Sequence, residues 1–306
     1  VETWDITNAF LQGLSYKTME KHARQLGIEM RVERKVYLRP PANTWRHFRE
    51  HPKSNIRIKE GMTLFFVLLL LKPMYGTVDA PLLFQMALAL FIRTDLEGQP
   101  SLMDDNFFHW TACLIIFMLW TIHVDDIIVA AKKAWLVWAL ELTEERFGKV
   151  KRHQLPFTHM GCCYERLPNG ALLVHQAPYT KNLQKAVIPA NRAQQVASIL
   201  TSTELHSFRS VVCSLLWLTL TRDDISCEVT MLQQKVSHAT IGELKQANNV
   251  IDRAKRNSIM AGLHFPKLVP PLRLVSVADA GHASKASAYA QEAGGIFVME
   301  DRLRGI

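Results

Sequence analysis

The first half of the chain switches repeatedly between strand-like and helix-like spacing of its apolar residues. Loose alternation of strand-forming residues predicts a strand over residues 4–11, and apolar residues at helical spacing predict helices over 15–30, 81–96 and 134–147. The polar and basic residues 42–60 are predicted to form a surface loop. The other strands predicted here are a short one ended by two prolines, a buried one, and two that flank a tight turn, at residues 36–41, 63–71, 111–120 and 122–130.

The pattern changes after residue 153. Residues 157–165 and 171–176 are predicted to form a hairpin, because a Pro-Asn-Gly turn sequence lies between them. The remaining predicted elements are helices over 202–263, with breaks near Arg222 and His238, and strands over 272–280 and 294–299.

Bulk properties limit the function without identifying it. The 306 residues are enough for about two domains. The formal charge of +8 and the pI near 9.3 suit a polyanionic partner such as nucleic acid. Two apolar runs, 62–71 and 111–122, are too short to span a bilayer, and the N-terminus lacks the apolar stretch of a signal peptide. The five cysteines form no CxxC pair and lie in apolar runs, so we expect reduced, buried thiols in a cytoplasmic or nuclear protein.

Two adjacent acids, Asp125 and Asp126, interrupt a strongly apolar, β-branched stretch. Neighbouring residues on a strand point to opposite faces, so one of two acids within a buried strand would be buried without a partner, at a cost of several kcal/mol. The conflict disappears if the acids occupy a hairpin turn and face divalent cations. Nucleotidyl transfer by two metal ions requires such oxygen ligands. An exposed turn or a helix cap remains the alternative interpretation of this pair.

A metal site of this kind needs a third carboxylate from the end of another strand. Asp5 meets that requirement, and the aromatic Phe10, five positions later, would be placed to stack under a nucleotide sugar. Taken alone, Asp5 is more typical of a helix cap.

Several segments, in the same order, resemble motifs of copia-type (Pseudoviridae-like) retrotransposon reverse transcriptases. Residues 5–13 (DITNAFLQG) resemble the first catalytic motif, and residues 124–126 (VDD) resemble the second. The other matching segments are VYLRPP, KPMYGTVDAP, the pair MGCCYE and GALLVHQAPY, FRSVVCSLLWLTLTRDDI and VADAGHA, at residues 36–41, 72–81, 160–165 with 170–179, 208–225 and 277–283.

The resemblance implies an α+β fold: a polymerase palm with an antiparallel sheet, a helical thumb and connection, and a partial ribonuclease H-like α/β unit. The corresponding domains would be a palm at 1–153, a primer-grip hairpin with helical thumb at 154–268, and the start of ribonuclease H at 269–306. We expect both ends of the family's domain set to be truncated, with the fingers incomplete.

The resemblance also implies the reaction and its residues. It implies an RNA-directed DNA polymerase that transfers deoxynucleotides from their triphosphates to a primer on an RNA or DNA template. Two Mg²⁺ ions, replaceable by Mn²⁺, would be bound by Asp5, Asp125 and Asp126. The other implied site residues are Ala9 and Phe10 at the nucleotide, with Phe10 as the gate against ribose, Gly76 and Pro81 beneath template and nucleotide, and Asp279 as a first ribonuclease H acid.

The chain departs from the family at Val78 and Asp79, where a Lys-Gln pair is usual before Ala-Pro. This departure keeps open a second interpretation, an inactive retroelement fragment that retains the palm fold and nucleic-acid binding. A third is a basic binding domain in which the acid pair is only a turn. Basic clusters that would be either solvated or in contact with a nucleic-acid backbone are Arg31, Arg34, Lys35, Arg46, Arg49, Lys149, Lys151 and Arg152.

Overall fold

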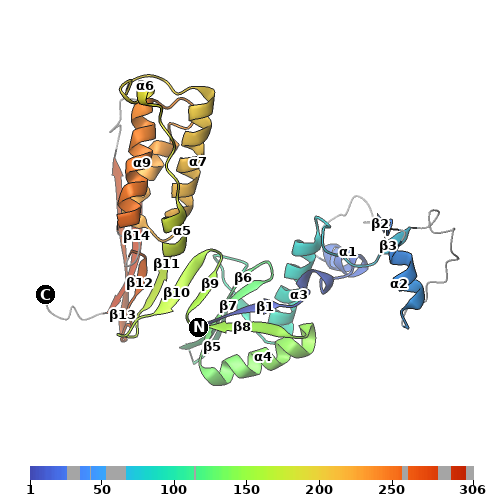
Figure 1. The fold of residues 1–306 in the computed structure, drawn as a ribbon. Helices are drawn as coiled ribbons and strands as arrows, with labels where there is room; N and C mark the ends of the chain where they lie inside the picture. The colour runs from blue at the N-terminus through green and yellow to red at the C-terminus, as the bar shows by residue number, and fades with distance from the viewer. Residues whose placement is uncertain are drawn as a thin grey trace. The chain divides into compact units, whose positions relative to one another are not determined.

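The computed structural model describes residues 1–25, 35–41, 43–52, 67–113, 115–256, 261–281 and 291–300. The chain divides into two compact units, Val1–Gln154 and Leu155–Ile306. Both combine helices with antiparallel sheet, which makes the fold α+β, as predicted (Figure 1).

The first unit is built on one antiparallel sheet with the strand order β4-β5-β6-β7-β1-β8. The N-terminal strand β1 therefore lies between β7 and β8, which come from more than 120 positions later in the chain. The strands are β1 (Glu2–Ile6), β4 (Gln99–Pro100), β5 (Phe107–Ala112), β6 (Ile115–His123), β7 (Asp126–Ala131) and β8 (Val150–Gln154).

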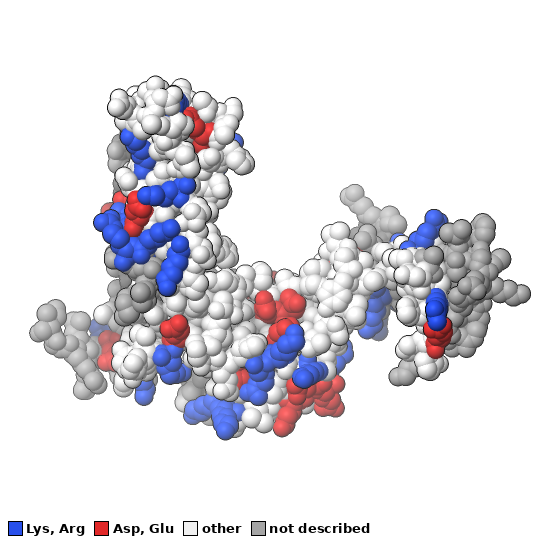
Figure 2. Space-filling view, in the orientation of Figure 1, with Lys and Arg blue, Asp and Glu red and all other residues white. Residues whose placement is uncertain are grey.

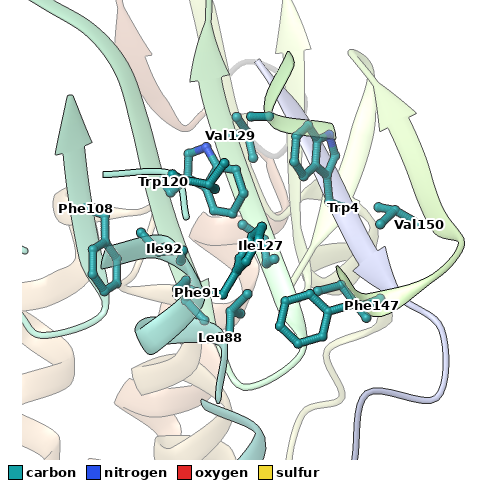
Figure 3. Close-up of a cluster of buried hydrophobic side chains, with 14 of the residues drawn as sticks. Trp4, Leu88, Phe91, Ile92, Phe108, Trp120, Ile127, Val129, Phe147 and Val150 are labelled. Atoms are coloured by element: carbon teal, nitrogen blue, oxygen red, sulfur yellow. The ribbon is translucent and has the colours of Figure 1, made fainter. Parts of the chain in front are cut away.

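Two helices, α3 (Ala80–Thr94) and α4 (Lys133–Phe147), cover one face of this sheet, which we call the inner face. Large aromatic side chains fill the space between the layers (Figure 3). The rings of Trp4 and Trp120 meet edge to face with centroids 5.1 Å apart, and both side chains are fully buried. Burial of such large apolar groups dominates the stability of a core, so this layer fixes the position of the sheet.

The segment after β1 returns against α3. It forms a short 3-10 helix, η1 (Ala9–Leu11), and α1 (Tyr16–Gln25). A Cβ atom on Gly13 would lie only 3.0 Å from the backbone nitrogen of Phe84, so the close approach to α3 requires glycine. The other elements of this unit are α2 (Thr44–Glu50) and the paired strands β2 (Val36–Leu38) and β3 (Leu68–Leu70).

The second unit combines a sheet of order β12-β11-β10-β9 with packed helices. Thr201 and Glu204 form a capping box that begins α7, as expected for a Thr-x-x-Glu sequence. The elements are β9 (Phe157–His159), β10 (Cys162–Arg166), β11 (Leu172–His175), α5 (Ala177–Asn182), α6 (Ala190–Ala193), α7 (Ser202–Leu218), η3 (Asp223–Ile225), α8 (Ser226–Gln233), α9 (Ile241–Arg256), β12 (Leu263–Phe265), β13 (Leu272–Gly281) and β14 (Gln291–Glu300).

Several predicted strands and one predicted helical run differ from the structure in where they end. The strand predicted over 4–11 ends at Ile6, because Asn8 adopts a left-handed backbone (φ 56°) and starts η1. Positive φ angles at Met160 and Gly161 divide the strand predicted over 157–165 into β9 and β10. The helical run predicted to residue 263 ends with the short strand β12.

Two burial predictions also fail. The segment predicted as a buried strand contributes β3, where Leu69 is 46% exposed, while its residues 63–66 lie outside the described part. Of the cysteines expected to be buried, Cys113, Cys213 and Cys227 are exposed. The loop predicted over 42–60 contains α2, and its residues 42 and 53–60 are not described. Across the described residues, no helix combines the length and apolar character needed to cross a membrane.

Candidate functional site

The structure places Asp5 directly opposite Asp126. The register of β1 on β7 pairs Trp4 with Ile127 and Asp5 with Asp126. Because strand residues alternate between faces, the tryptophan and isoleucine enter the core while both aspartates lie on the other face of the sheet, the outer face. Side chains directly opposite each other have Cβ atoms about 5 Å apart, so the two carboxylates are neighbours.

Asp125 joins them from the turn between β6 and β7. Val124 has a left-handed φ of 59°, and β7 begins at Asp126. The turn therefore lies at Val124 and Asp125. Asp125 occupies the hairpin turn as predicted, whereas Asp126 is already the first residue of β7. The strands predicted over 111–120 and 122–130 would have met earlier, at residue 121. An earlier turn beyond Ala112 falls inside the first predicted strand and separates β5 from β6. We call Asp5, Asp125 and Asp126 the carboxylate site.

The strand register places the carboxylate site within a row of charged groups across four strands. His123 on β6 pairs with Asp126 on β7, which pairs with Asp5 on β1, which in turn pairs with Lys151 on β8. In this row, a histidine on β6 and a lysine on β8 lie on either side of two aspartates. Like charges directly opposite each other destabilise a sheet, so packing alone gives no reason for two adjacent aspartates at its centre.

The electrostatics of Asp125 reflect this crowding. Partial burial raises the pKa of Asp125 above its ordinary value of 3.8, and the negative charges of Asp126 and Asp5 raise it further. A hydrogen bond to the backbone and the nearby His123 act in the opposite direction without cancelling the increase. An added positive charge would relieve the repulsion among the three carboxylates.

Lys151 already supplies one such charge to Asp5. Its Nζ donates a hydrogen bond to Oδ2 of Asp5 over 3.0 Å. In the described residues, no three His, Cys, Asp or Glu side chains are grouped closely enough to hold one metal ion as they stand. Ion binding at the carboxylate site would therefore require side-chain movement, which for Asp5 includes breaking its hydrogen bond to Lys151.

An aromatic group lies in the segment that follows Asp5. Ala9 is buried, and the ring of Phe10 meets the ring of Tyr75 at an angle of 62°, with centroids 5.4 Å apart. Gly76 follows with φ 90°, which a residue with a side chain rarely adopts. Pro81 occupies the first turn of α3, where its missing N–H costs no hydrogen bond. The predicted nucleotide-side residues Phe10 and Gly76 thus flank Tyr75, which sequence reasoning did not single out.

The inner face of the same strands carries a very different acid. Glu2 is 4% exposed, and it accepts hydrogen bonds from the indole of Trp4, from Arg152 and from Gln154. Burial would raise the pKa of Glu2, but these hydrogen bonds and the charge of Arg152 lower it below the ordinary value of 4.5. Arg152, predicted to be solvated or on a nucleic-acid backbone, pairs with this buried carboxylate while its own side chain remains 31% exposed.

Asp279, the predicted ribonuclease H acid, lies in the second unit. It is exposed on β13 and pairs with Ala293 of β14. None of the described residues forms a metal-ligand set with it.

Lys151 and His123 are the members of the row that sequence reasoning missed as site residues. The segment 150–154 (VKRHQ) is too polar to signal a strand, so its alternation was not used. Alternation would have separated Lys151 and His153 from Arg152 and placed the first two on the face of Asp5.

Other basic residues gather on the second unit. Figure 2 shows Lys and Arg side chains over α5 and the end of α9, where Lys181, Arg253, Lys255 and Arg256 lie in the last turns. Arg253 pairs with Glu228, and the nearby Lys185 pairs with Asp252. Of the predicted basic clusters, residues 31 and 34 and the side chain of residue 49 lie outside the description.

Comparison with known proteins adds no further information on this site. No protein-family model matches the chain, and no curated protein matches its sequence. The geometry of the carboxylate site and the motif resemblance are thus the grounds for a functional proposal.

Proposed function

We propose that the chain is the reverse-transcriptase part of a copia-type retrotransposon polyprotein. It transfers deoxynucleotides to the 3′-hydroxyl of a primer paired with an RNA or DNA template. The antiparallel sheet with α3 and α4 serves as the palm. The hairpin β10–β11 and the helices α7 to α9 serve as primer grip and thumb, and β13 and β14 begin a ribonuclease H-like unit.

One observation carries this proposal: the register that pairs Asp5 with Asp126. The two residues come from separate motifs and are 121 positions apart, yet they are direct cross-strand neighbours beside Asp125. A basic protein whose acid pair was only a turn would have no reason to place a third acid there. Repulsion within the group has a stability cost that metal binding would offset.

The residues of the carboxylate site fit two Mg²⁺ ions. Carboxylate oxygens are the ligands that Mg²⁺ and Mn²⁺ prefer. Partial burial raises the pKa of Asp125, and the charges of Asp126 and Asp5 raise it further. When bound, such ions stabilise the charge that develops on the attacking and leaving oxygens. Asp5 and Asp126 hold the ions from adjacent strands, and Asp125 holds them from the turn.

Phe10 selects the sugar in this proposal. Its ring follows Asp5 by five positions and is braced by Tyr75, so it would exclude a 2′-hydroxyl by steric contact. Phe10→Ala should raise ribonucleotide incorporation relative to deoxynucleotide incorporation. The ratio of kcat/KM for the two nucleotides measures this selection, and an unchanged ratio would remove the gate assignment.

The specific observation in favour of an inactive fragment is the segment before Pro81. Val78 is 92% exposed and Asp79 is acidic, where the family resemblance leads us to expect a basic and an amide side chain near the template. This second candidate function retains nucleic-acid binding by the basic surfaces and lacks turnover.

Primer extension by the full chain distinguishes the two candidates. We would use an RNA template with a labelled DNA primer, complementary deoxynucleotides, and Mg²⁺ or Mn²⁺. Wild type should extend the primer. Asp126→Asn should extend it about 1,000-fold more slowly, because the metals contribute several kcal/mol to transition-state stabilisation. Asp105→Asn is the matched control, since it removes the same charge from an exposed acid of the same unit.

Equal extension by wild type and Asp126→Asn would contradict the polymerase proposal. Binding of the primer–template without extension by wild type would favour the inactive fragment. Loss in both Asp126→Asn and Asp105→Asn would mean that net charge, not the carboxylate site, governs activity.

A further inference from the structure

Lys151 lies on the opposite side of Asp5 from the other two acids. Strand β1 separates β7, which carries Asp126, from β8, which carries Lys151. The hydrogen bond from Lys151 to Asp5 therefore draws the carboxylate of Asp5 toward β8 and away from β7. The backbone of Asp5 is paired with that of Asp126, but its carboxylate is held by Lys151. The contact with Lys151 thus explains why the three acids are not grouped as a set of metal ligands in the described residues.

The pair is a weak structural element. The side chain of Lys151 is 59% exposed and that of Asp5 is 40% exposed, so water and salt screen their attraction. A lysine ammonium is a mobile point charge on a flexible chain, which a more highly charged ion can replace without disturbing the sheet. Adjacent Arg152, in contrast, is fixed by several hydrogen bonds to buried Glu2.

We propose that Lys151 is an internal competitor for the divalent cation at the carboxylate site. In the structure it donates a hydrogen bond to Asp5. When an ion binds, Asp5 turns toward Asp125 and Asp126 and Lys151 is displaced. The inference rests on the proposed function, and it assigns Lys151 as a positioning residue that keeps the affinity for free metal low.

Two effects set the size of this competition. Metal binding must first break the Lys151–Asp5 pair, and the displaced ammonium then repels the bound ion at short range. Removing the ammonium eliminates both effects. We expect Lys151→Met to bind Mn²⁺ about tenfold more tightly than wild type.

The test is direct Mn²⁺ binding to the full chain, without nucleotide or nucleic acid, followed by electron paramagnetic resonance of free Mn²⁺. Lys149→Met is the matched control, because Lys149 is exposed, precedes β8 and carries the same charge. Lys151→Arg retains a cation that can also pair with Asp5, so it should not show the tighter binding of Lys151→Met. Thermal unfolding of each variant verifies that the sheet is intact.

The outcomes separate this inference from the proposed function. Tighter binding by Lys151→Met, with Lys149→Met and Lys151→Arg close to wild type, supports the competitor role. Equal binding by Lys151→Met and Lys149→Met overturns the competitor role, and the carboxylate site stands if Asp126→Asn still abolishes binding. Binding that Asp126→Asn leaves unchanged overturns the carboxylate site and the competitor role together.

Discussion

The two faces of β1 differ in how many hydrogen-bond donors surround their carboxylates. On the inner face, Glu2 is almost fully buried, and donors from Trp4, Arg152 and Gln154 occupy its oxygens. On the outer face, three positions later, Asp5 lies opposite another aspartate and accepts a hydrogen bond from Lys151. The pKa of Glu2 is lowered and that of Asp125 is raised.

This contrast teaches how to separate structural from functional acids in a single sheet. A buried carboxylate is tolerated when donors match its oxygens, and removing one donor exposes the desolvation cost. A group of partly exposed acids with too few donors serves no packing purpose. Its like charges repel one another, and the hydrogen bond from Lys151 compensates the charge of Asp5 alone.

The largest expected effect comes from comparing substitutions at two adjacent residues of β8, Arg152 and Lys151. Arg152→Met should destabilise the first unit by about 3 kcal/mol, because it leaves Glu2 buried without its cationic partner. Lys151→Met should change stability by less than about 0.5 kcal/mol, because its pair with Asp5 is partly exposed. Hydrogen exchange of the β1 and β8 amides measures both. Similar losses in the two variants would contradict the division between faces.

The sequence predicted the elements of the sheet better than their ends. Helices α3 and α4 were found because each is a stretch of 15 residues rich in helix formers, without glycine and without proline beyond the first turn. The end of β1 was missed because it depends on a left-handed backbone at Asn8, which no apolar pattern encodes. Strand β8 was missed because four of its five residues are polar.

The sequence singled out the three acids of the candidate site, but not the side chains that contact them. Asp5, Asp125 and Asp126 were singled out by an acid in an apolar context and by motif order. The contact of Lys151 with Asp5 depends on the order β7-β1-β8, which places residues 146 positions apart side by side. Local spacing contains no information on such a pairing, and the inward turn of Arg152 depends on it too.

An intermediate effect is expected from the two tryptophans that share the core beneath these faces. The indole of Trp4 donates to Glu2, whereas the buried Nε1 of Trp120 has no hydrogen-bond partner in the described part of the chain. Replacement by Phe removes similar area from both. Trp4→Phe should therefore cost about 1–2 kcal/mol more than Trp120→Phe, which is the contribution of a hydrogen bond to a charged group. Urea unfolding of the two variants checks this difference, and equal midpoints would mean that Glu2 does not need the indole.

The smallest effect is a difference in sign between two acids as the pH falls. Because the pKa of Glu2 is lowered on folding, its stabilising contribution is present above 4.5 and is lost as the pH falls through the lowered value. Because the pKa of Asp125 is raised on folding, its ionisation destabilises the fold, and this penalty disappears as the pH falls from the raised value toward 3.8.

In metal-free buffer, Glu2→Gln should therefore be less stable than wild type at neutral pH, and this difference in stability should disappear in acid. Asp125→Asn should be slightly more stable than wild type at neutral pH, and this difference should also disappear in acid. Thermal unfolding between pH 3 and pH 7 measures these differences. If Glu2→Gln and Asp125→Asn changed the unfolding temperature in the same direction, the two acids would share one environment and the contrast between the faces would be contradicted.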